Sequence, residues 1–151
     1  MSLNSIKAFR HTGIVVSNME ESKHFYETIL GLEVIQEFSD NSPYVNTLLN
    51  LTDANVSMCK LKTNDDFVIE LLYYPNHKTI NPQLPVHNNG ICHLAFEIAN
   101  ADMLYDTFID HNINVLSQPI VSSEKFAKVF FAIDPNNVHI ECVEIIKNEN
   151  V

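Results

Sequence analysis

The sequence has few cysteines, few basic residues and no long hydrophobic run, and each shortage argues against a class of protein. Its three cysteines, Cys59, Cys92 and Cys142, include no C-x-x-C pair, and their odd number argues against a disulfide framework or a thiolate zinc site. All three lie in apolar runs, which predicts buried, inert thiols. Only 9 lysines and arginines oppose 19 aspartates and glutamates, giving a formal net charge of −10. Without a basic patch, nucleic acid is not an expected partner.

The hydrophobic residues are spread along the chain in short runs. No window approaches the roughly 18 consecutive apolar residues of a membrane-spanning helix, and the first eleven residues lack the apolar block of a signal peptide. We therefore expect a cytoplasmic protein with no membrane partner. The length of 151 residues, with 46% hydrophobic and 19% charged residues, is typical of one ordinary globular domain.

The first half of the chain predicts one strand, one helix and three more strands. Residues 9–17 alternate and are β-branched, which indicates a strand. Asn18, with Glu21 three positions later, forms a capping box for a helix over 19–30, whose apolar residues recur every three or four positions. Gly31 is placed to end that helix. The three further strands are predicted at 32–38, 56–62 and 67–74, after a polar stretch near 40–44 and around a turn at 63–66.

The second half repeats this order. A strand is predicted at 91–98, followed by a helix around 103–111 that either Asn100 or Asp102 begins. Three more strands are predicted at 113–118, 128–133 and 138–146, with a turn at 134–137 before the last one. The repeat predicts the α+β class, with two tandem βαβββ modules that form a curved mixed sheet. We assign a single domain, 1–151, with module 1 at 5–75, a linker loop rich in proline and asparagine at 76–89, and module 2 at 90–147.

Two histidines and two glutamates occupy equivalent places in the two modules. His11 and His93 lie in the first strand of each module, and Glu70 and Glu141 lie in the last strand. A charged carboxylate within an apolar run such as FVIELLYYPN, residues 67–76, is costly unless it has a partner. Two imidazoles and two carboxylates that converge make a mixed nitrogen and oxygen site for a divalent first-row metal, with positions open to water or substrate. A metal ion would supply the countercharge that Glu70 needs.

Each of these residues also has a structural interpretation. A single histidine in a strand is more often a hydrogen-bonded structural residue than a ligand, and Glu70 or Glu141 alone could point to solvent. The four together favour the metal site. His139, two residues before Glu141 and on the same strand face, is the best competitor for a ligand or pocket role. Tyr74 shares the face of Glu70, so it could line a substrate pocket or pack in the core.

Four segments resemble one known family. The segments FRHTGIVVSNMEESKHFYETILGLEV, VIELLYY, GICHLAFEI and DPNNVHIECVEI resemble, in order and spacing, the vicinal oxygen chelate superfamily, which includes glyoxalase I, methylmalonyl-CoA epimerase, extradiol dioxygenases and fosfomycin-resistance proteins. The resemblance covers nearly the whole chain and is strongest to lactoylglutathione lyase-like proteins. It implies the vicinal oxygen chelate fold and metal-ligand roles for His11, Glu70, His93 and Glu141. The implied cofactor is one divalent ion, among Ni, Zn, Co, Mn and Fe.

The resemblance also implies a reaction. It predicts a metal-dependent lyase or isomerase of the glyoxalase I type, in which a small carbonyl or thioester substrate loses a proton and a metal-stabilised enediolate forms. Glu141 would be both ligand and general base, with Glu70 as its symmetric counterpart. Family members pair their modules across a dimer, so a homodimer is expected. Glyoxalase I usually has an arginine for glutathione where this chain has Val15 and Val16, so the sequence does not support glutathione recognition.

Three alternatives stay open at the level of sequence. A methylmalonyl-CoA epimerase-like isomerase usually has a glutamine as its second ligand. A ring-cleaving dioxygenase uses two histidines and one glutamate, leaves the Glu70 position without a ligand role, and usually has two such domains in a longer chain. A non-catalytic small-molecule-binding protein of the bleomycin-resistance kind usually lacks the complete set of four. The intact set therefore favours the glyoxalase-type enzyme.

Overall fold

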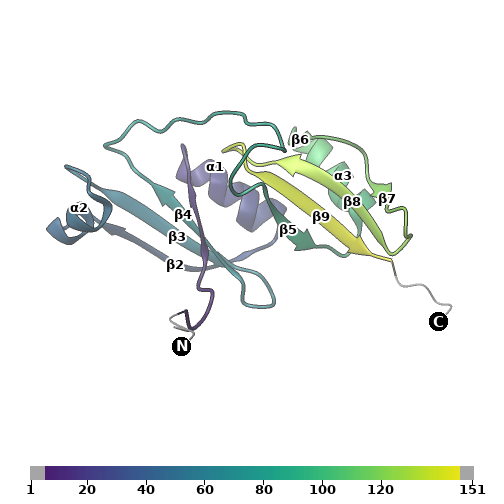
Figure 1. Cartoon of the computed structure of the whole chain (residues 1–151), viewed down its shortest axis with the longest axis horizontal. Helices are drawn as coiled ribbons and strands as arrows, with labels where there is room; N and C mark the ends of the chain where they lie inside the picture. Colours follow the sequence, from purple (N-terminus) through teal and green to yellow (C-terminus); the bar gives the residue numbers. More distant parts are fainter. Residues whose placement is uncertain (1–5, 147–151) are drawn as a thin grey trace. The chain divides into compact units, whose positions relative to one another are not determined.

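A computed structural model describes residues 6–146, and the chain divides into two units, 1–80 and 81–151 (Figure 1). Each unit contains its own β-sheet and its own long helical segment. Among residues 6–146, no helix combines the length and the apolar character that crossing a membrane requires.

Unit 1 is built on a four-stranded mixed sheet with the strand order β1-β4-β3-β2. β1 runs parallel to β4, and the other neighbours are antiparallel. Its elements are β1 (Thr12–Val15), α1 (Met19–Lys23), the π-helix η1 (His24–Ile29), β2 (Glu33–Asp40), α2 (Pro43–Leu49), β3 (Val56–Lys62) and β4 (Val68–Tyr73).

The helix predicted over 19–30 is present, but its second half is a π-helix rather than an α-helix. Asn18 caps α1, because its side-chain oxygen accepts a hydrogen bond of 3.2 Å from the backbone N–H of Glu21. The following six residues form η1, in which hydrogen bonds span five residues rather than four. Gly31, at a φ of 77°, lies directly after the helix, in the left-handed conformation that glycine adopts without steric cost. Both predicted ends of the helix are confirmed.

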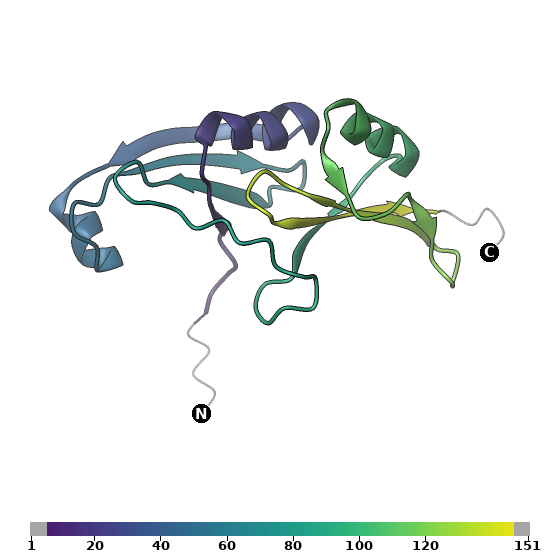
Figure 2. The same ribbon diagram turned by 90° about the horizontal axis from the view of Figure 1, so that it is seen from above.

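The helical segment covers one face of the unit 1 sheet (Figure 2). The rings of Phe25 and Tyr26 are fully buried and meet edge to face, with their centroids 5.1 Å apart. Alternate residues of the two central strands are buried with them, namely Cys59, Leu61, Ile69 and Leu71. Since successive side chains of a strand point to opposite faces, Lys60 and Glu70 lie on the other face.

Within the polar stretch near 40–44, β2 continues to Asp40 and α2, a helix that the sequence did not predict, follows almost at once. A carboxylate oxygen of Asp40 accepts a hydrogen bond of 2.8 Å from the backbone N–H of Ser42. Pro43 occupies the start of the helix, where its missing N–H has no cost. The helix is held by the buried Val45, which packs with residues of the chain that follows, Ala54 and Val56, and with the partly buried Leu51, Met58, Leu72 and Tyr74.

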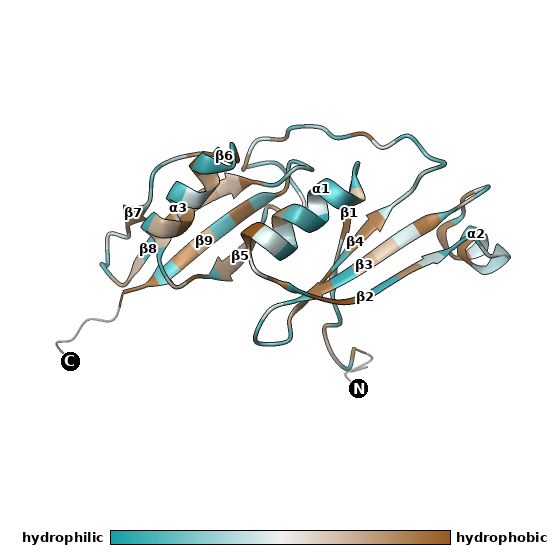
Figure 3. Cartoon of the chain, turned by 180° about the vertical axis from the view of Figure 1, so that it is seen from behind, coloured by the Kyte–Doolittle hydropathy of each residue, from teal (hydrophilic) through white to brown (hydrophobic). Residues whose placement is uncertain are grey.

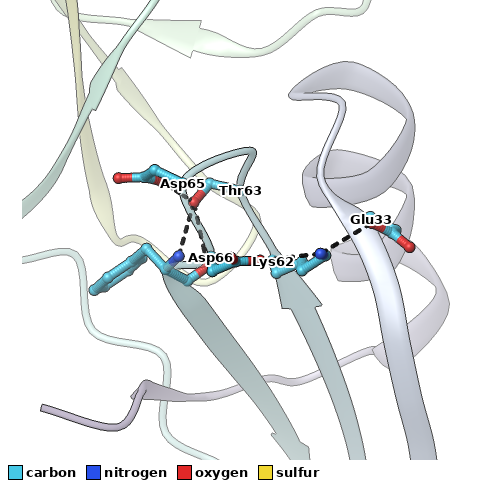
Figure 4. A network of polar contacts seen from close by, with 6 residues as sticks. Glu33, Lys62, Thr63, Asp65 and Asp66 are labelled. Atoms are coloured by element: carbon cyan, nitrogen blue, oxygen red, sulfur yellow. Dashed lines mark hydrogen bonds and ion pairs between the residues drawn. The ribbon is translucent and has the colours of Figure 1, made fainter. Parts of the chain in front are cut away.

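The predicted turn at 63–66 is confirmed and joins β3 to β4 (Figure 4). The N–H of Thr63 donates to the carbonyl of Phe67 at 3.0 Å, and the N–H of Phe67 donates to the Thr63 hydroxyl at 3.1 Å. Beside the turn, the ammonium group of Lys62 lies 3.0 Å from a carboxylate oxygen of Asp66 and 3.6 Å from one of Glu33. Lys62 therefore already has two anionic partners.

Unit 2 is built on a mixed sheet with the strand order β5-β9-β8-β6, to which β7 adds by pairing with β8. β5 runs parallel to β9, and the other pairs are antiparallel. The predicted strand at 113–118 is shorter, and the following Pro119 separates it from β7, which the sequence did not predict. The elements are β5 (His93–Glu97), α3 (Ala101–Asp110), β6 (Asn114–Val115), β7 (Ile120–Val121), β8 (Ala127–Ile133) and β9 (His139–Ile145).

Asn100, rather than Asp102, caps helix α3. The side-chain oxygen of Asn100 accepts a hydrogen bond of 2.9 Å from the N–H of Met103. A second free N–H of the first turn, that of Ala101, donates to a carboxylate oxygen of Glu144 at 2.7 Å. The negative charge of Glu144 is favourable at the N-terminus of the helix. Because Glu144 belongs to β9, the same hydrogen bond connects α3 to that strand.

The core of unit 2 is aromatic. The ring of Phe130 meets those of Phe108 and Tyr105 at centroid distances of 5.7 and 5.9 Å. Hydrophobic and hydrophilic residues follow one another along β9 (Figure 3), and its Ile140 and Cys142 are fully buried. The alternation leaves His139, Glu141 and Val143 on the opposite face of the strand.

The predicted turn at 134–137 is confirmed. One carboxylate oxygen of the buried Asp134 accepts hydrogen bonds of 2.7 Å from the N–H groups of both Asn136 and Val138. This turn fixes the start of β9. The α+β class and the repeated βαβββ order are therefore confirmed, with α2 and β7 as additions.

We predict that Asn100→Ala lowers the free energy of unfolding by about 1 kcal/mol, because the N–H of Met103 loses its acceptor. Urea unfolding followed by circular dichroism measures the change. The exposed Asn89, in the loop before β5, supplies the control, and Asn89→Ala should stay within about 0.5 kcal/mol of the native chain. Equal losses in the two variants would contradict the assignment of the cap.

Candidate metal centre

Unit 1 brings His11 and Glu70 into contact. His11 lies directly before β1, which is shorter than predicted, and Glu70 lies in the middle of β4. Because these two strands are parallel neighbours, His11 Nε2 lies 3.1 Å from Glu70 Oε2. The Glu70 side chain is 11% exposed and the His11 side chain 32% exposed. The carboxylate in the apolar run is thus on the face away from α1, and its first partner is an imidazole.

Unit 2 repeats this arrangement with His93 and Glu141. His93 is the first residue of β5, and Glu141 lies in the middle of β9, the parallel neighbour of β5. His93 Nε2 lies 3.0 Å from Glu141 Oε2. The Glu141 side chain is 25% exposed, so it is more open to solvent than its counterpart in unit 1.

The two pairs share one strand register. In unit 1 the residue opposite Glu70 on the parallel strand is Gly13, and in unit 2 the residue opposite Glu141 is Ala95. Each histidine stands two positions before that small residue. Because glycine has no side chain and alanine has only a methyl group, the imidazole ring has room to contact the glutamate. Space at Gly13 is limited, because a Cβ placed there would lie 3.2 Å from Leu72 Cδ1.

The donor atoms of each pair are compatible with a shared metal ion. Bonds of about 2.0–2.2 Å from nitrogen and oxygen donors at a right angle place neighbouring donors about 3 Å apart. The observed separations are 3.1 and 3.0 Å. Imidazole with carboxylate also suits first-row divalent metals. Each pair could supply two of the four protein ligands of a metal site. Among residues 6–146, no three or more histidine, cysteine, aspartate or glutamate side chains lie close enough together to hold an ion.

The two pairs differ in their third neighbour. Lys60 faces Glu70 from β3, and its ammonium nitrogen lies 3.4 Å from Glu70 Oε1. The equivalent position opposite Glu141, on β8, holds Phe131. The Phe131 ring meets the imidazole of His93 edge to face at a centroid distance of 5.4 Å. The sequence alone does not indicate either residue, because each becomes a neighbour of its glutamate only through the register of the paired strands.

Tyr74 and His139 lie near the pairs. Tyr74 packs against the cluster of Val45, Ala54 and Val56. Burial and the charge of Glu70 raise the pKa of its hydroxyl. His139 is buried and pairs with His93 across the parallel strands. Tyr74 is therefore a core residue at the edge of the site, and His139 lies beside the ligand candidate in unit 2.

The expectation of three buried thiols is wrong for Cys92. Cys59 and Cys142 are buried, but Cys92 lies outside β5 and is exposed. Its thiol donates to the carbonyl of Val86 at 3.1 Å, and its sulfur lies 3.2 Å from Nδ1 of His93. That contact leaves the other imidazole nitrogen facing Glu141.

Comparison with known proteins identifies relatives along nearly the whole chain. The model of the Glyoxalase/Bleomycin resistance protein/Dioxygenase superfamily matches residues 10–144. An uncharacterised protein of Bacillus subtilis, YwkD, is 28% identical over 144 residues, which cover 92% of this chain and 98% of that protein.

Two solved structures show the same fold. The crystal structure of a glyoxalase family protein from Bacillus cereus has a TM-score of 0.88 at 19% identity, covering 97% of this chain and 99% of that one. The fosfomycin resistance protein FosX from Listeria monocytogenes, in complex with Mn(II) and sulfate, has a TM-score of 0.64 at 13% identity, covering 93% of this chain and 94% of that one.

We predict that only Cys92 reacts rapidly with Ellman's reagent at pH 8. Burial raises the pKa of Cys59 to about 11 and that of Cys142 to about 12, above the ordinary value of 9.0. A raised pKa leaves less reactive thiolate at a given pH, about 100-fold less for Cys59. One thiol per chain should react within minutes, and all three after unfolding in guanidinium. In Cys92→Ser the fast reaction should disappear, and its persistence would contradict this assignment.

Proposed function

Since the chain belongs to the Glyoxalase/Bleomycin resistance protein/Dioxygenase superfamily, we propose that it is a divalent-metal-dependent lyase or isomerase of the glyoxalase I type. One observation carries the proposal: two His–Glu pairs of equal geometry stand at the same register in two units. The substrate is a small carbonyl compound or thioester that loses a proton from the carbon next to its carbonyl group.

In this proposal the two pairs serve one metal centre. His11, Glu70, His93 and Glu141 supply two nitrogen and two oxygen donors to one divalent ion, and the two units act together as a single domain. Four protein ligands leave positions open on an ion that takes six. The chain works as a homodimer in the cytoplasm. The donor types and the donor separations of 3.1 and 3.0 Å support the ligand set.

The two glutamates have different roles in this proposal. When bound, the ion would supply positive charge that stabilises the anion left after the substrate loses its proton. Glu141 accepts that proton as the general base, because its carboxylate is the more exposed of the two and its strand neighbour is the uncharged Phe131. Glu70 is fixed between His11 and Lys60, so it holds its position.

The ligand set predicts the behaviour of two histidine variants. The native chain should bind one Mn²⁺ or Ni²⁺ per chain, and both His11→Ala and His93→Ala should weaken binding by about 100-fold or more, since each loses one of four donors. Equilibrium dialysis with elemental analysis measures the stoichiometry and affinity. The exposed His87 supplies the control, and His87→Ala should bind metal as the native chain does.

Unfolding curves of all variants, recorded without metal, separate lost ligands from lost structure. A native chain that binds no divalent ion would refute the proposed metal centre. Unchanged affinity in His93→Ala would remove unit 2 from it.

The proposed base predicts a loss of proton exchange. Metal-loaded protein should catalyse exchange of the α-proton of a substrate into D₂O, found by screening hemithioacetals and acyl-CoA thioesters by NMR. Glu141→Gln should lower the exchange rate at saturating metal by about 10²–10⁴-fold, because an amide cannot accept the proton. The matched control is the exposed Glu124, with Glu124→Gln at the native rate. Proton exchange at the native rate in Glu141→Gln would refute the assignment of Glu141 as the general base. Consumption of O₂ with catechols as substrates would favour a ring-cleaving dioxygenase instead.

A further inference from the structure

The cation beside Glu70 breaks the equivalence of the two units. The units agree in the His–Glu distance and in the small residue on the parallel strand. They disagree at the antiparallel neighbour of the glutamate, which is Lys60 in unit 1 and Phe131 in unit 2. With neutral histidines, the formal charge is −1 + 1 = 0 for Glu70 with Lys60, and −1 for Glu141 with Phe131.

The Lys60 side chain is held in place by two contacts. Its ammonium nitrogen lies 3.4 Å from Glu70 Oε1 and 5.5 Å from the centroid of the Phe38 ring. The side chain is 21% exposed, so most of it is covered by its neighbours. An ammonium group has three donors, and Glu70 occupies one of them. Lys60 therefore keeps donors for a further anion at a fixed place beside Glu70.

Lys62, a second cation on β3, is not available in the same way. Lys62, two residues further along β3, lies within 4 Å of the carboxylates of both Asp66 and Glu33 (Figure 4). The chain as a whole has a formal net charge of −10 and repels anions at long range. An anionic ligand thus gains attraction only at short range, within about 10 Å of a cation that keeps hydrogen-bond donors for it.

We propose that Lys60 is a specificity-determining residue that selects substrates with a carboxylate next to the reacting carbonyl, as in 2-oxo acids. The inference rests on the proposed function, since it places the substrate at the metal held by Glu70. The formal charges of a divalent ion, two glutamates and Lys60 sum to 2 − 2 + 1 = +1. A monoanionic substrate brings this sum to zero. Without Lys60 the same substrate would leave the site at −1.

The test compares an anionic with a neutral probe on Mn²⁺-loaded protein. Pyruvate and hydroxyacetone have nearly the same shape, but only pyruvate carries a carboxylate. Paramagnetic broadening of the methyl NMR signal of each probe gives its dissociation constant without requiring turnover. In Lys60→Met the pyruvate affinity should fall about tenfold or more, because one charge-assisted hydrogen bond is lost, while hydroxyacetone should bind within about twofold of the native protein.

Two further variants act as controls. Lys60→Arg keeps the charge and should restore pyruvate binding to within about threefold of the native value. Lys62→Met removes the same charge from the same strand and should leave both probes unaffected. Mn²⁺ affinity and the unfolding midpoint are measured first for every variant, so that binding is compared only between folded, loaded proteins.

The outcomes separate the two proposals. A native protein that takes up no Mn²⁺ refutes the proposed function. A native protein that is loaded with Mn²⁺ but binds pyruvate no better than hydroxyacetone overturns the inference on Lys60 alone. Equal losses of pyruvate binding in Lys60→Met and Lys62→Met would also overturn it, since a general loss of positive charge would then explain the result.

Discussion

Parallel pairing of the first and last strands of each unit is the constraint on which the rest of the structure depends. The pairs β1–β4 and β5–β9 place a residue from the start of each unit beside one near its end. A parallel pair needs a long crossover, and the intervening helix and strands provide it. Only this pairing brings His11 to Glu70 and His93 to Glu141, which are far apart in the sequence.

Much of this arrangement could be predicted from the sequence, because its signals are local. The caps Asn18 and Asn100 and the turns at 63–66 and 134–137 use side chains that bond to the nearby backbone, and all are present. The short α2 was missed because its stability comes from Val45 packing on residues outside the helix. Because side chains alternate between the two faces of a strand, the sequence also indicates which residues share a face with each glutamate.

The parts of the site that could not be predicted depend on strand register. Sequence spacing shows that Glu70 and Lys60 point to one face or the other of their strands, but only the register of β3 on β4 makes them neighbours. The same holds for Phe131 and Glu141. Cys92 was misjudged because the apolar run that contains it begins before the start of β5, where the backbone has not yet joined the sheet. Duplication thus indicates the two His–Glu contacts better than the residues that surround them.

The closeness of Leu72 to Gly13 connects the strand that follows His11 with the packing of α2. A methyl group at position 13 would press on Leu72, whose side chain rests against the cluster of Val45, Ala54 and Val56. Leu72 can recede only as far as that packed cluster yields, and packed interiors yield little. The small helix α2 therefore limits which residue the strand after His11 can carry at position 13, although it contributes no residue to the His11–Glu70 pair.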